Sequence, residues 1–168
     1  MARRRLGVEQ YRDAMLFVSG ELDTGSGPSL ELSDPKNLRR TVYARVSRLK
    51  LDPELMTFDY PDANVHAEKR ATTTTAIQKL FVLNSDFVLD RARAVAARLG
   101  PEDTGDDGRV RRAYRLLFAR DPGEDEIDIA RAYLSGPSSR TEDGKPVLSR
   151  WERYVHALLA SNEMLYVD

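Results

Sequence analysis

The chain has 168 residues, of which 41% are hydrophobic and 32% charged, and a domain of this length can bury roughly 70% of the surface that its unfolded chain exposes. With 26 Lys and Arg against 27 Asp and Glu, the net charge is −1, which excludes a global electrostatic attraction to nucleic acid or anionic lipid. The absence of cysteine excludes disulfides, thiolate metal sites and haem attached through cysteine in this chain.

A helical pattern begins close to the N-terminus. From residue 8 to about residue 22, Tyr11, Met15, Val18 and Leu22 recur at helical spacing, which predicts an amphipathic helix. The residues before it contain no apolar run typical of a signal peptide, and no window approaches the roughly 20 apolar residues of a membrane span. We interpret this abrupt start as that of a domain within a longer protein.

Residues 29–47 leave two interpretations open. Leu30 alternates with polar neighbours, a following Asp-Pro pair suits a type I turn, and Val42 and Val46 alternate again. This pattern favours a short β-hairpin near residues 29–47. Because Val42 and Val46 also fit one face of a helix, both strand and helix stay open for residues 39–49.

Two capping signals predict the next helix starts. Asp52 before Pro53 is typical of a helix N-cap followed by proline at the first helical position. Thr75 and Gln78 have the spacing of a capping box. The helix that begins there has an apolar face, which is formed by Ile77, Leu80, Phe81 and Leu83.

The second half of the chain is helical by its apolar spacing. Stripes over residues 86–99 and 109–119, from Ile127 to Leu134, and after Ser149 each predict a helix. The short link after residue 119 predicts an αα-hairpin, and the polar, turn-rich residues 135–147 are expected to be a mobile loop. The fold class is therefore mainly α, an irregular bundle of five or six helices in a single domain over residues 1–168.

A polar segment over residues 57–70 is the main candidate site. Its candidate binding residues are Asp59, Asp62, Asn64, His66 and Arg70. A calcium loop of the EF-hand type does not fit, because Ala67 and Thr73 stand where that loop requires Gly and Glu. A zinc site is not expected either, since the chain has only two histidines. We assign no metal site.

The carboxylates of this segment have two interpretations. Asp59 and Asp62 could serve as the carboxylate pair of a glycoside hydrolase, although nothing in the sequence sets their separation. Alternatively, Asp and Asn beside Pro61 form local turns with the backbone, and Arg70 pairs with Asp59 or Asp62 to close the loop. We favour the second interpretation and assign no catalytic residue.

Several motifs together resemble a known family. The motifs are FD-x-P-D-x-N from Phe58, R-x-x-T-T-T from Arg70 and SNE-x-L-Y-V-D from Ser161. They resemble the C-terminal domain of unknown function of large exported planctomycete-type proteins that often carry cytochrome-c-like modules. The resemblance covers nearly all of the chain except residues 135–147, and it carries no established catalytic residue.

The resemblance implies an extracytoplasmic location, a haem group only elsewhere in the full-length protein, and a link to the breakdown of complex polysaccharides. Our first hypothesis is a non-catalytic helical module that packs against the remaining domains of its parent protein and exposes an apolar patch. The second is a carbohydrate-binding or carbohydrate-hydrolysing domain that uses residues 57–70. It requires those side chains to converge in a pocket.

Overall fold

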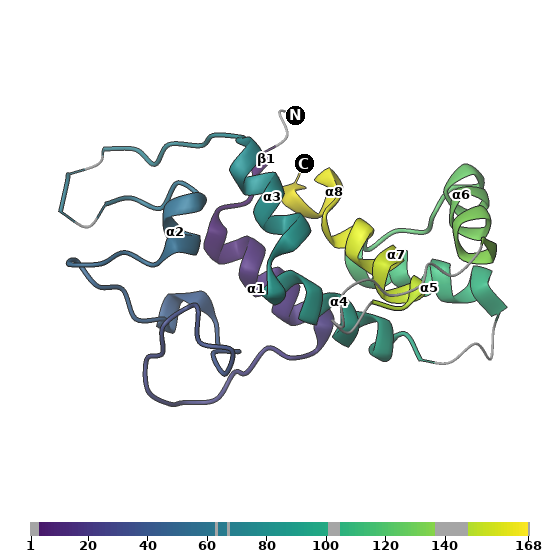
Figure 1. Ribbon diagram of the computed structural model, residues 1–168, viewed down its shortest axis with the longest axis horizontal. Helices are drawn as coiled ribbons and strands as arrows, with labels where there is room; N and C mark the ends of the chain where they lie inside the picture. The colour runs from purple at the N-terminus through teal and green to yellow at the C-terminus, as the bar shows by residue number, and fades with distance from the viewer. Residues whose placement is uncertain (1–3, 63, 67, 101–104, 137–147, 168) are drawn as a thin grey trace, which may run out of the picture.

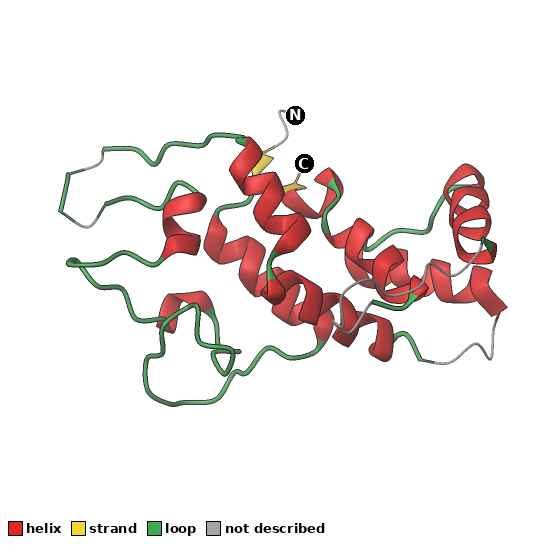
Figure 2. Cartoon of the chain, in the orientation of Figure 1, coloured by secondary structure: helices red, strands yellow, loops and turns green. Residues whose placement is uncertain are grey.

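α-Helices make up most of the structure, a computed structural model that describes residues 4–62, 64–66, 68–100, 105–136 and 148–167 (Figures 1 and 2). The described residues form eight α-helices, a 3₁₀ helix η1 and two short strands. In chain order they are β1 (Arg4–Arg5), α1 (Val8–Ser19), η1 (Thr41–Tyr43), α2 (Pro53–Thr57), α3 (Ala76–Asn84), α4 (Asp86–Arg98), α5 (Gly105–Phe118), α6 (Glu124–Ser135), α7 (Arg150–Leu159), α8 (Asn162–Leu165) and β2 (Tyr166–Val167).

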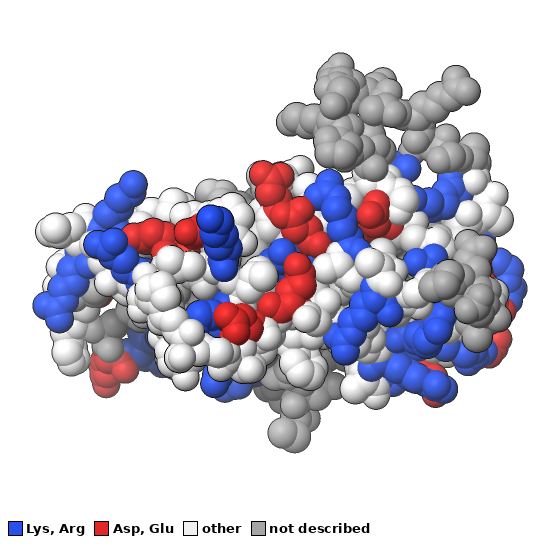
Figure 3. Space-filling model, turned by 90° about the horizontal axis from the view of Figure 1, so that it is seen from below, with Lys and Arg blue, Asp and Glu red and all other residues white. Residues whose placement is uncertain are grey.

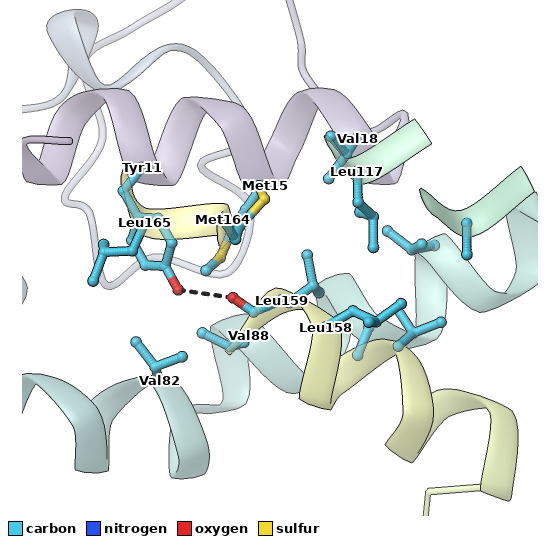
Figure 4. Close-up of a cluster of buried hydrophobic side chains, with 14 of the residues drawn as sticks. Tyr11, Met15, Val18, Val82, Val88, Leu117, Leu158, Leu159, Met164 and Leu165 are labelled. Carbon is cyan, nitrogen blue, oxygen red and sulfur yellow. Dashed lines mark hydrogen bonds between the residues drawn. The ribbon is translucent and has the colours of Figure 1, made fainter. Parts of the chain in front are cut away.

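The core lies where α4 packs against both α1 and α7. Most of the large, fully buried side chains come from these three helices, at Met15, Leu16, Val88, Val95, Val155 and Leu159, and α2, α5 and α6 add Leu55, Val110 and Ile127. Figure 4 shows the Tyr11 ring reaching into this core, where its hydroxyl donates a hydrogen bond of 3.3 Å to the carbonyl of Leu159. A buried tyrosine therefore keeps its polar group bonded, as burial requires.

Long loops and a helical hairpin occupy opposite ends of the molecule. In Figure 1 the loops between α1 and α3 form one end, and α5 and α6 lie toward the other. The predicted αα-hairpin is confirmed, because α5 and α6 pack against each other. At its turn, Arg120 binds both carboxylate oxygens of Glu126 at 2.7 Å and also contacts Glu163, which ties the hairpin to α8.

The mainly helical fold is confirmed. The β-hairpin expected near residues 29–47 is not present, and the only strand pair among the described residues lies elsewhere. The pair joins β1 to β2 in antiparallel register, with Arg4 opposite Val167 and Arg5 opposite Tyr166. Residues 29–47 instead contain η1, and Arg39 forms an isolated bridge with Asp23, which precedes this range. The expected mobile loop over residues 135–147 lies outside the described residues from residue 137 onward.

One backbone bond and several side-chain bonds hold residues 29–47 in place of a hairpin ladder. The Leu30 carbonyl accepts from the backbone N–H of Arg45 at 2.8 Å, and the Asn37 amide donates to the carbonyls of Leu30 and Glu31. The backbone N–H and hydroxyl of Thr41 both donate to Asp13 on α1, each at 2.7 Å. This contact with α1 fixes the start of η1.

Both predicted helix caps before the core helices are present. Asp52 accepts from the N–H of Glu54 at 2.8 Å at the start of α2. Thr75 accepts from the N–H of Gln78, and the Gln78 side chain accepts from the N–H of Thr75. The described residues contain eight α-helices where five or six were expected, and α8 has no predicted counterpart because its four residues give no apolar periodicity of their own.

Candidate functional site

Asp59 lies at the centre of a hydrogen-bonded network between distant parts of the chain. Its carboxylate accepts from the guanidinium of Arg5 at 2.7 Å, from the N–H and hydroxyl of Thr73 at 2.9 and 2.7 Å, and from the amide of Gln78 at 3.3 Å. Arg5 also donates to the side-chain oxygen of Gln78 at 2.6 Å and to the carbonyl of Thr73. The network joins β1, the turn after α2 and the entrance to α3.

The network fixes both the backbone and the charge of Asp59. Its φ of 62° is in the left-handed region, which Asp and Asn tolerate better than other side chains with a Cβ. Partial burial raises the pKa of Asp59, but the hydrogen bonds from Thr73 and Arg5 outweigh burial and lower the pKa below its ordinary value of 3.8. Asp59 is therefore a carboxylate at neutral pH.

Asp62 and Asn64 form a turn on the surface. The Asp62 carboxylate accepts from the backbone N–H of Asn64 at 2.8 Å and from its side-chain amide at 3.1 Å. The same amide donates to the carbonyl of Arg48 at 2.8 Å. Both residues are exposed, and their bonds join two loops.

Neither His66 nor Arg70 takes part in the hydrogen bonds of this turn. His66 is exposed. Arg70 binds Glu9 on α1 at 2.6 Å, and its guanidinium lies 5.0 Å from the centre of the Tyr60 ring. The predicted pairing of Arg70 with Asp59 or Asp62 is therefore wrong: Glu9 takes that role, and Arg5 is the cation that binds Asp59.

The five candidate residues do not all converge. Asp59 and Arg70 line the same cavity, of about 210 Å³, whereas Asp62 and Asn64 contact each other in the surface turn. Among the described residues, no group of three or more His, Asp or Glu side chains could hold a metal ion. The second histidine, His156, makes a 3.0 Å hydrogen bond through Nε2 with the carbonyl of Val82.

A second cavity involves residues that the sequence interpretation missed. It has a volume of about 420 Å³ and lies beside the first, sharing Glu9, Gln10, Tyr60 and Arg70 with it. Its remaining lining combines polar groups of α1 and η1 with aliphatic side chains, at Asp13, Leu32, Arg40, Thr41, Val42, Ala44, Val46 and Leu55. The spacing of Glu9 and Asp13, one helical turn apart, was the available signal, because it places both carboxylates on one face of α1.

A third cavity, of about 290 Å³, contains a carboxylate with an unusual charge state. Glu54 lines it together with Asp34, Asp86 and Asp90. Burial, with a further contribution from the nearby Asp52, raises the pKa of Glu54 to about 7, against the opposing effect of Arg12. Glu54 is thus close to half-protonated at neutral pH.

Chemically, the partly buried polar groups of the 57–70 segment are engaged, and the side chains of His66, Glu68 and Lys69 are exposed. The one partly buried carboxylate of the segment, Asp59, has hydrogen bonds to both oxygens, so it is poorly placed to act as a general base or nucleophile. One acceptor is instead available at Glu9, which together with Arg70 lines both adjoining cavities. Oε1 of Glu9 accepts from Arg70, whereas the buried Oε2 has no hydrogen-bond partner among the described residues.

Comparison with known proteins gives a match over most of the chain. The model of the PSD1 family, whose description is protein of unknown function (DUF1553), matches residues 1–134. No curated protein and no solved structure matches the chain. The matched span reaches into α6 and includes all five candidate residues, Glu9 and Glu54.

Proposed function

The chain belongs to the PSD1 family of unknown function, and from this premise we propose that it is a non-catalytic helical module that binds another part of its parent protein. The observation that carries the proposal is the outward face of α3. Ile77, Leu80 and Leu83 follow one another at intervals of three residues, and these residues are 67, 57 and 51% exposed. Apolar side chains at this spacing form one continuous face of a helix.

Three of the four residues of the apolar face predicted for α3 are therefore exposed. The inward side of the helix carries Gln78 and Val82, which are buried, and Phe81, which is partly buried. Gln78 faces inward because its side chain serves both the capping box and the Asp59 network. The more apolar side of α3 therefore faces solvent, which is typical of a surface that another chain segment covers.

The polar segment also supports a structural role. The bonds of Asp59 hold the entrance of α3 against β1, and the bonds of Asp62 and Asn64 connect two loops. Each of these contacts positions the backbone. We infer that residues 57–70 mainly set the position of α3 and thus of its exposed face.

The wider setting is part of the same proposal. The motif resemblance supports an exported, extracytoplasmic parent protein in which a cytochrome-c-like module carries any haem. It also supports a link to the breakdown of complex polysaccharides. In this setting the occupant of the α3 face is one of the remaining domains of the parent protein.

The α3 face is tested by hydroxyl-radical footprinting of this chain alone and of the full-length parent protein. We expect Leu80 to be modified readily in the chain alone and to be protected in the parent. Leu80→Asp is expected to abolish that protection at Ile77 and Leu83, while changing the stability of the isolated chain by no more than about 0.5 kcal/mol because the side chain is exposed.

Ile129→Asp on α6 is the matched control, since Ile129 has a similar exposure of 69% but lies outside the α3 face. This variant is expected to leave the protection of Leu80 in the parent unchanged. Equal modification of Leu80 in the chain alone and in the parent would contradict the proposal.

A carbohydrate-binding role is the second candidate, and the cavity of about 420 Å³ is the observation that favours it. Its volume is within the range of small-ligand pockets. Tyr60 and aliphatic side chains line it beside Glu9, Gln10 and Arg70. A sugar ring presents C–H groups to apolar surfaces and hydroxyls to such polar groups.

Calorimetric titration of plain and sulfated glycans tests this candidate. Arg70→Ala is expected to weaken binding of any ligand in the cavity by about tenfold or more, because a hydrogen bond to a charged group is lost. Asp62→Ala and His66→Ala are expected to leave binding unchanged. Absence of binding by any glycan, or loss of binding in the Asp62 and His66 variants alone, would count against the cavity.

A further inference from the structure

Two loop tips lie side by side at the end of the molecule opposite α6. The hydrogen bond of 2.8 Å from the Asn64 side chain to the Arg48 carbonyl brings them together. Leu49 in one tip is 100% exposed, and Val65 in the other is 65% exposed. These paired tips, residues 48–50 and 64–66, thus present two aliphatic side chains directly to solvent.

Positive charge surrounds the first tip. Residues 36–50 contain six Lys and Arg and no Asp or Glu, although the chain as a whole has a net charge of −1. Within the described residues, the side chains of Arg48 and Lys50 have no hydrogen-bond or ion-pair partner. Leu49 therefore stands between two cations that are free to bind an anionic surface.

The neighbouring arginines are only weakly neutralised. Arg45 contacts Glu31 at 3.6 Å and has 65% of its side chain exposed, and Arg40 contacts Asp13 at 3.4 Å with 58% exposed. Exposed ion pairs of this kind contribute little and are readily exchanged. Figure 3 shows Lys and Arg side chains at the end of the molecule formed by these loops, the left end in the views of both Figures 1 and 3.

We propose that the paired tips dock on the surface of an anionic lipid bilayer. Leu49 and Val65 enter the headgroup layer, and Arg48 and Lys50 contact lipid phosphates beside them. Aliphatic side chains between cations match this boundary, where apolar insertion and attraction to anionic lipid act together. The fully exposed Leu49 can enter a lipid bilayer, because the bilayer surface deforms around an inserted side chain. A protein partner would need a hollow complementary to the tip.

The site is separate from the α3 face, and it involves contact with one leaflet only. Because the chain outside residues 36–50 carries more Asp and Glu than Lys and Arg, an anionic bilayer attracts the loop end through residues 36–50, and the net negative charge of the other residues favours their facing away from it. This asymmetry orients the molecule with its loop end toward the lipid. The net charge of the whole chain conceals this local attraction.

Co-sedimentation of the whole chain with vesicles tests the proposal. We expect binding to vesicles of phosphatidylcholine and phosphatidylserine, no binding to vesicles of phosphatidylcholine alone, and weaker binding as salt is raised. Arg48→Glu with Lys50→Glu is expected to abolish binding. Leu49→Ser with Val65→Ser is expected to weaken it by about tenfold, through the loss of apolar insertion.

Ile129→Ser is the control, since Ile129 is equally apolar and 69% exposed but lies on α6. It should bind vesicles as the unchanged chain does, and circular dichroism should show that all variants stay folded. The proposal is overturned by equal binding to both vesicle types, by no binding to either, or by full binding of the Leu49 and Val65 variant. Binding to polyglutamate without binding to vesicles would assign the tips to an acidic protein instead.

Discussion

Replacing Asp59 with alanine is expected to lower the free energy of unfolding by about 3–5 kcal/mol, the usual cost of removing one partner from a buried ion pair. The Arg5 side chain is only 4% exposed and Asp59 is its carboxylate partner. Without Asp59 the guanidinium stays buried with an uncompensated charge, and two donors of Thr73 lose their acceptor. Alanine at a φ of 62° adds strain of about 1 kcal/mol.

Urea unfolding followed by circular dichroism measures this loss, and Asp62→Ala is the matched control. Asp62 is the same residue type in the same segment, but it is exposed and bonds only within its own turn. Its replacement should cost about 0.5 kcal/mol or less. Asp59→Asn should fall between the two, because asparagine tolerates the backbone conformation but carries no charge. A loss below about 1 kcal/mol for Asp59→Ala would show that Arg5 finds another partner.

The protein is expected to become more stable as the pH is lowered from about 7 toward 4.5. The pKa of Glu54 is about 7 in the folded protein, against an ordinary value of 4.5. Between these values the folded state holds the Glu54 proton and the unfolded state releases it, so the free energy of unfolding rises as pH falls. The rise is at most about 3 kcal/mol for a shift of this size.

Glu54→Gln is expected to remove this pH dependence, since glutamine resembles the protonated acid at every pH. Unfolding free energies measured from pH 8 to pH 4.5 should then be nearly constant for the variant. Asp59 acts in the opposite sense: its pKa is lowered below 3.8, so its contribution is lost as the pH falls through the folded value. The same slope in the variant and the unchanged chain would mean that Glu54 does not titrate in this window.

Most helix starts were predicted well, because a helix cap depends on only a few consecutive residues. The caps at Asp52 and Thr75 satisfy N–H groups within two or three residues of themselves. Such contacts require no knowledge of the rest of the fold. The end of α1 is an exception, because the left-handed Gly20 bonds to Leu16 and Phe17 and ends the helix at Ser19, before the predicted end near residue 22.

The candidate site could not be predicted in the same way, because its bonds join residues far apart in sequence. Arg5 and Asp59 are 54 positions apart, and Glu9 and Arg70 are 61 apart. The sequence offered many arginines and carboxylates of equal chemical suitability, and only tertiary structure selects the pairs. The partners of Asp59 and Arg70 were therefore assigned wrongly although the need for such partners was recognised.

The exposed face of α3 illustrates a second limit. Apolar residues occur on both sides of this helix, so periodicity gives no unique buried face. A long-range contact makes the choice: Gln78 must point inward to reach Arg5 and Asp59. Because Gln78 points inward, the aliphatic side of α3 faces solvent.

The pairing of β1 with β2 has a mechanical consequence. A force that pulls residues 4 and 167 apart opens this strand pair first, one residue pair at a time, before it reaches the helices. As Arg5 leaves the pair, its guanidinium is withdrawn from Asp59, Thr73 and Gln78. Tension on the two ends would therefore release the anchorage of α3 while the contacts among α1, α4 and α7 remain intact.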